Sequence, residues 1–153
     1  MPLTHDFPPN VTTLFLPGLY LDEVRTARDY VSLVLRDETD DSRSTAALLT
    51  SELVTNALVH GDARNSACPR TGLLALRRPL HVTVEILGAR ICVLVCGSGS
   101  RRARVAPRPT LTWESSGRGL ALVAALSAEW GTHGDTASRT VWFALDRAKA
   151  VAA

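Results

Sequence analysis

The sequence of 153 residues has no run of about 18 uncharged apolar residues, the length that a membrane-spanning helix needs. Residues 1–15 also lack the basic segment and apolar run of a secretory signal. Its three cysteines, Cys68, Cys92 and Cys96, are an odd number and form no disulfide framework. We therefore expect a cytoplasmic protein without a membrane segment.

Strong charge is lacking as well. The net charge is +2 at pH 7, which is too small to predict direct binding to nucleic acid. Hydrophobic residues make up 46% of the chain and charged residues 21%, which excludes a largely disordered protein. A length of 153 residues suits one domain with a hydrophobic core.

The hydrophobic pattern predicts three helices and four strands, and no internal repeat is found. Helices are expected at about 21–36, from Ser42 or Ser44 to His60, and at about 119–130, and strands at 11–16, 80–87, 91–96 and 140–145. The first strand is expected at a sheet edge, and the second and third form a hairpin. This order predicts an α+β two-layer sandwich, with helices on one face of a mixed, mostly antiparallel sheet. We place the domain at 19–147, a lead-in at 1–18 and a tail at 148–153.

The second predicted helix is apolar nearly all round, which favours a buried helix. Glu52 and Asn56 are four residues apart and therefore share one of its faces. A carboxylate in apolar surroundings is costly unless it is paired or ligating. The pair can hold a hydrated Mg²⁺ and position a hydroxyl, but a solvated or capping pair fits this helix equally well.

The longest irregular stretch, residues 97–116, begins with one glycine segment and is followed by another. Gly117 and Gly119 precede an apolar helix, where free backbone N–H groups can bind phosphate. Gly97 and Gly99 follow a strand, where glycine lets a backbone approach a ligand closely. In isolation, the segment at Gly117 also fits a flexible loop that ends in a helix start, and the segment at Gly97 an ordinary turn.

Taken in order, these features resemble the ATP-binding domain shared by gyrase, MutL and sensor histidine kinases, a fold of the Bergerat type. More narrowly, they resemble the stand-alone anti-sigma-factor serine kinases and related actinobacterial regulators. The resemblance covers about residues 19–145 and is strongest at 52–57, 117–123 and 140–145.

The resemblance implies an ATP-dependent serine/threonine protein kinase that binds a sigma factor, an antagonist (anti-anti-sigma) protein, or both. Glu52 would be the general base, Asn56 would ligate Mg²⁺, and 100–116 would form a lid over ATP. The implied nucleotide-binding residues are Asn56, Gly97, Gly99, Gly117, Arg118, Gly119 and Leu120.

One position departs from the family. The family has an aspartate at the end of the central strand, which accepts a hydrogen bond from the adenine amino group. Strand parity puts Ile91, Val93, Val95 and Gly97 on one face, so Gly97 stands where that aspartate is expected. The alternative function is therefore a nucleotide-independent protein-interaction module of the same fold.

The opposite parity places apolar residues on the sheet face away from the helices. They are Cys92, Leu94, Cys96 and Trp142. An apolar patch on an otherwise exposed face indicates an interface. We expect a homodimer or another protein partner to cover it.

Overall fold

The computed structural model describes residues 10–18, 20–60, 79–98, 118–135 and 138–148. In chain order the elements are β1 (Asn10–Leu16), α1 (Glu23–Val34), α2 (Asp40–His60), β2 (Leu80–Leu87), β3 (Arg90–Ser98), α3 (Arg118–Leu126), β4 (Glu129–Gly134) and β5 (Ser138–Asp146). None of the described helices is long and apolar enough to cross a membrane.

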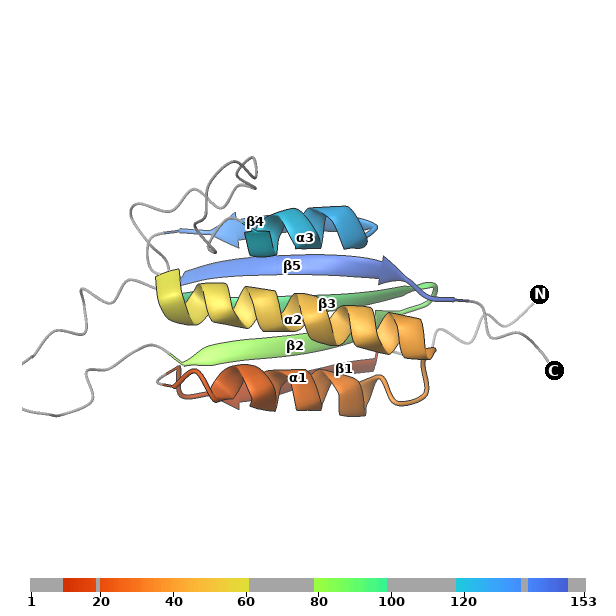
Figure 1. The fold of residues 1–153 in the computed structure, drawn as a ribbon, viewed down its shortest axis with the longest axis horizontal. Coiled ribbons are helices and arrows are strands. Elements are labelled where there is room, and N and C mark those ends of the chain that lie inside the picture. The colour runs from red at the N-terminus through yellow and green to blue at the C-terminus, as the bar shows by residue number, and fades with distance from the viewer. Residues whose placement is uncertain (1–9, 19, 61–78, 99–117, 136–137, 149–153) are drawn as a thin grey trace, which may run out of the picture.

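The sheet has five strands in the order β1-β2-β3-β5-β4, and every neighbouring pair is antiparallel. All three helices lie on the same face of this sheet, with α2 between α1 and α3 (Figure 1). The α+β two-layer sandwich is therefore confirmed, and so is the edge position of the first strand.

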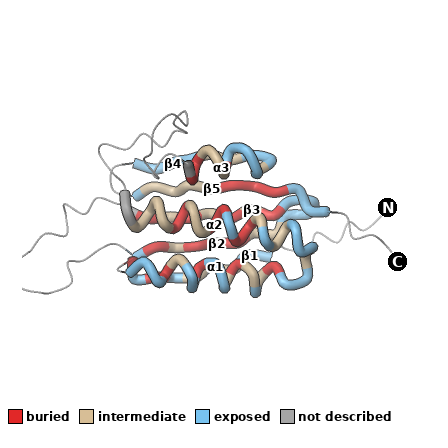
Figure 2. The backbone as a smooth tube through the Cα atoms, viewed as in Figure 1, coloured by how far each residue is buried: buried red, intermediate tan, exposed pale blue. Residues whose placement is uncertain are grey.

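The core lies between the two layers, as the buried segments in Figure 2 show. Alternation in β2 produces this layer, because Leu80, Val82 and Val84 are buried whereas the residues between them are partly exposed. The largest fully buried side chains come from both layers: Phe143, Leu35, Leu49, Ile91, Val31, Val54, Val82, Val84, Val93 and Val123. Burial of this apolar surface is the main stabilising contribution.

The helix starts differ from the expected ones. Thr39, rather than Ser42 or Ser44, caps α2, because the Ser42 N–H donates a hydrogen bond to Thr39 Oγ1 (3.2 Å). The turn before α1 is held by the buried carboxylate of Glu23, which accepts hydrogen bonds from the N–H groups of Gly18 and Tyr20 (2.8 Å each).

The prediction of a helix up to residue 130 was wrong. Helix α3 ends at Leu126, and Trp130 lies in β4, opposite Phe143 of β5. The Ser127 hydroxyl donates to the carbonyl of Val123, and the Ala128 N–H donates to the carbonyl of Ala144 in β5 (2.9 Å). The chain thus passes from the helix into the sheet within two residues.

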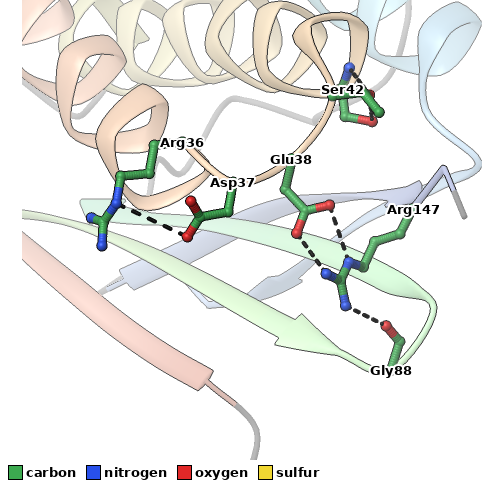
Figure 3. Close-up of polar contacts among 7 residues, drawn as sticks. Arg36, Asp37, Glu38, Ser42, Gly88 and Arg147 are labelled. Carbon is green, nitrogen blue, oxygen red and sulfur yellow. Dashed lines mark hydrogen bonds and ion pairs between the residues drawn. The ribbon is translucent and has the colours of Figure 1, made fainter. Parts of the chain in front are cut away.

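Arg147 joins three segments at one end of the sheet (Figure 3). Its Nη2 and Nε donate to the two carboxylate oxygens of Glu38 (2.7 and 3.1 Å), and its Nη1 donates to the carbonyl of Gly88 (3.0 Å). The Glu38 side chain is only 8% exposed. The contacts fasten the α1–α2 connection to the β2–β3 turn and to the end of β5.

Candidate functional site

Helix α2 places Glu52 and Asn56 against the first turn of α3. A Cβ atom added at Gly119 would lie 2.5 Å from Glu52 Oε2 and 3.5 Å from Asn56 Nδ2. Only glycine leaves room for the Glu52 carboxylate in its present position. The structure therefore brings the pair Glu52 and Asn56 next to a residue far away in the sequence, since Gly119 follows Asn56 by 119 − 56 = 63 positions.

In the part of the chain that the structure describes, neither Glu52 nor Asn56 stabilises the fold through a polar contact. Both are half-buried, and within the described part of the chain neither makes a hydrogen bond or an ion pair. Other polar residues of α2 bond to their own helix: the hydroxyls of Ser51 and Thr55 donate to the carbonyls of Ala47 and Ser51. Glu52 and Asn56 are thus available to a ligand beside the N-terminal N–H groups of α3.

Gly97 lies on the helix-facing side of β3, as strand parity predicted. Ile91, Val93, Val95 and Gly97 are all buried. A Cβ atom at Gly97 would lie 3.5 Å from the Cβ of Ala57, the α2 residue that follows Asn56, and 2.7 Å from Cδ2 of Leu80. Gly97 does not have a positive φ, so its backbone does not require glycine. The space of the missing side chain is taken by a Leu80 methyl group.

Of the remaining predicted site residues, some lie outside the described residues and two lie in α3. Gly99, Gly117 and the proposed lid, 100–116, lie outside the described residues. Arg118 begins α3. Leu120 belongs to the hydrophobic core and is 8% exposed, which leaves its backbone as the part that can face a ligand.

Sequence analysis missed Arg139. It pairs with Gly97 across β3 and β5, and directly paired residues project to the same face. Its Nε is inaccessible to solvent and has no hydrogen-bond partner. Extending the alternation of Val141, Phe143 and Leu145 back by one step would have placed residue 139 on the helix-facing side.

The apolar patch on the other face is partly exposed. Cys92, Leu94, Cys96 and Trp142 are all half-buried. The Trp142 ring packs over Gly131 of β4, where an added Cβ would lie 2.9 Å from Cζ2 and Nε1 of the indole. Burial raises the pKa of the Cys92 thiol, so this cysteine stays protonated at neutral pH. In the described parts of the chain no cluster of three or more His, Cys, Asp or Glu residues could hold a metal ion.

The sequence matches no family model and no curated protein. The fold is similar to a crystal structure of the RsbU and RsbW domains of Rv1364c from Mycobacterium tuberculosis. The TM-score is 0.63 at 16% sequence identity, and the match covers 90% of this chain and 32% of that chain. The chain thus spans about a third of that protein's length, and the likeness shows a shared fold.

Proposed function

We propose that this protein is a nucleotide-binding, partner-switching regulator of the anti-sigma-factor serine kinase type. One observation carries the proposal: Glu52 and Asn56, without polar partners among the described residues, face Gly119 at the start of α3. The fold shared with a protein that contains an RsbW domain supports the same class. The proposed partners are a sigma factor and its antagonist.

The residues present suit a nucleoside triphosphate with Mg²⁺. Mg²⁺ prefers hard oxygen ligands and usually takes only one or two from the protein, with phosphates and waters completing the set. The amide oxygen of Asn56 is such a ligand. When bound, Mg²⁺ neutralises charge on the phosphates.

The protein's own groups then have separable roles. The N–H groups at the start of α3 bind phosphate oxygens, since the positive end of the helix favours negative charge. Glu52 orients the serine hydroxyl of the antagonist protein and accepts its proton as the phosphoryl group is transferred. The half-buried position of Glu52 limits competition from water.

A second candidate is a protein-interaction module that does not need a nucleotide. It is favoured by Gly97, where no side chain can accept a hydrogen bond from adenine and a Leu80 methyl group occupies the space. In this case the fold and the partner surfaces would be retained while the pocket serves no ligand.

Calorimetric titration with Mg²⁺-nucleotides separates the two candidates, and phosphorylation of the cognate antagonist then tests the roles. We expect Glu52→Gln to retain nucleotide binding and to lose phosphotransfer by at least about 100-fold, within the range of general acid–base catalysis. Asn56→Ala should weaken binding only when Mg²⁺ is present. Asp41→Asn, which neutralises an exposed carboxylate in the first turn of α2, is the matched control.

The outcomes are distinct. Unchanged phosphotransfer in Glu52→Gln would remove the role given to this residue. No binding of any nucleotide by the wild-type protein, together with retained binding of a sigma factor or antagonist, would favour the interaction module.

A further inference from the structure

We propose that the part of the site at Gly97, here called the base end, binds a 6-oxopurine, guanine or hypoxanthine, in preference to adenine. We propose further that Arg139 is the residue that determines this specificity. The inference rests on the proposed function, because it assumes that a purine nucleotide occupies the site. It goes further in naming the chemistry that selects the base.

The position of Arg139 follows from the strand register. Gly97 of β3 and Gly134 of β4 are its direct partners on the two sides. The contacts of Gly97 with Ala57 and Leu80 identify its face as the one that the helices cover. Arg139 therefore projects from the same face, and neither neighbouring strand has a side chain beside it.

Among the described residues, the guanidinium group of Arg139 has no polar partner. Arg139 makes no hydrogen bond or ion pair within the described residues, and its Nε is also shielded from solvent. Buried polar atoms without partners are rare, and the cost is greater for charged groups. Three other described arginines with partly shielded side chains show the usual arrangement: Arg147 pairs with Glu38, Arg90 with Glu129 and Arg43 with Asp40. A ligand that offers acceptor atoms would satisfy Arg139.

The purine bases differ in what they offer to such a site. The 6-amino group of adenine is a donor, so it needs an acceptor, and Gly97 supplies none from a side chain. Guanine and hypoxanthine carry O6 and N7, two acceptors that match the paired donors of an arginine. Compared with a site that has an aspartate at position 97, the pair Gly97 and Arg139 lacks the carboxylate acceptor and provides guanidinium donors instead. This pair therefore offers donors where adenine requires an acceptor.

Titration of the wild-type protein with the Mg²⁺ complexes of ATP, GTP and ITP tests the inference. We expect GTP and ITP to bind alike and each about tenfold more tightly than ATP, within the discrimination of a bidentate arginine contact. Arg139→Met should reduce GTP and ITP binding to the level of ATP, and Arg139→Lys should do so in part because lysine lacks the planar fork. Arg28→Met, which removes an exposed arginine of α1, is the control.

Each result has one meaning. ATP binding equal to or tighter than GTP binding would overturn the inference and leave the proposed function standing. A GTP/ATP ratio that is unchanged in both folded Arg139 variants would remove Arg139 as the determinant, as would binding of GTP without binding of ITP, since hypoxanthine lacks only the 2-amino group. No binding of any of the three nucleotides would overturn the proposed function and this inference together.

Discussion

The substitution Gly97→Asp is expected to tighten ATP binding and to shift base preference toward adenine. It introduces a carboxylate on the helix-facing side of β3, beside Ala57. A hydrogen bond to a charged group contributes about 1.5–3 kcal/mol, which corresponds to about 10- to 100-fold in the dissociation constant of ATP. A carboxylate has two oxygens, so it can accept from adenine and from Arg139 together.

The structure also shows what opposes this gain. The new Cβ would lie 2.7 Å from Cδ2 of Leu80, a side chain that is only 2% exposed, so Leu80 must rotate. The backbone adds no strain, because the φ of Gly97 is not positive. Leu80→Val removes the obstructing methyl group and costs about 1 kcal/mol of stability for one buried methylene. The double variant Gly97→Asp/Leu80→Val should therefore show the full gain.

The assay is calorimetric titration of the wild-type protein, both single variants and the double variant with ATP and GTP, with circular dichroism to check folding. Cys96→Asp is the matched control, because it adds the same charge to the opposite face of the same strand. Unchanged ATP affinity and base preference in a folded double variant would refute the placement of Gly97 at the base end of the site.

Three further predictions concern other contacts. Gly119→Ala places a Cβ 2.5 Å from Glu52 Oε2, so the carboxylate must move; we expect phosphotransfer to fall at least about tenfold with little change in the urea midpoint, and equal activity would contradict the assigned geometry. Arg147→Met leaves the mostly buried Glu38 without its partner and should lower the free energy of unfolding by about 1–3 kcal/mol, measured in urea against Arg36→Met, which removes an exposed pair. The apolar outer face should support a homodimer that Leu94→Glu disrupts, and a wild-type protein that sediments as a monomer at all concentrations would exclude it.

The sequence predicted those parts of the fold in which local pattern and tertiary structure agree. Clean alternation from Leu80 to Leu87 and the Gly88–Ala89 turn predicted the hairpin, and the parity of Ile91, Val93 and Val95 in the next strand correctly placed Gly97 on the helix-facing side. The four-residue spacing of Glu52 and Asn56 predicted a shared face. The family resemblance placed Gly119 in the same nucleotide site, but the direct contact of Gly119 with the Glu52 carboxylate follows only from the packing of α3 on α2.

The errors arose where a tertiary contact overrides the local signal. The helix was predicted to continue to Trp130, but from Glu129 onward the chain pairs with β5 as strand β4, whose residues are exposed or half-buried, so this pairing overrides the local pattern. Thr39 and Ser42 are both good capping residues, and only the path of the preceding turn selects Thr39. The closeness of Arg139 to Gly97 required the β3–β5 register, which joins residues 42 positions apart, with 139 − 97 = 42.

The register of the sheet has a consequence for how this domain can be joined to others. Asn10, Ile86, Ile91 and Leu145 lie in one row across four strands, so the described chain enters and leaves the sheet at the same end. Gly97 lies six residues further along β3, about 20 Å away at ~3.3 Å per residue. A domain or affinity tag attached before β1 or after β5 would therefore join the sheet at the end opposite to Gly97, and fusion at either side should leave ligand access at Gly97 intact.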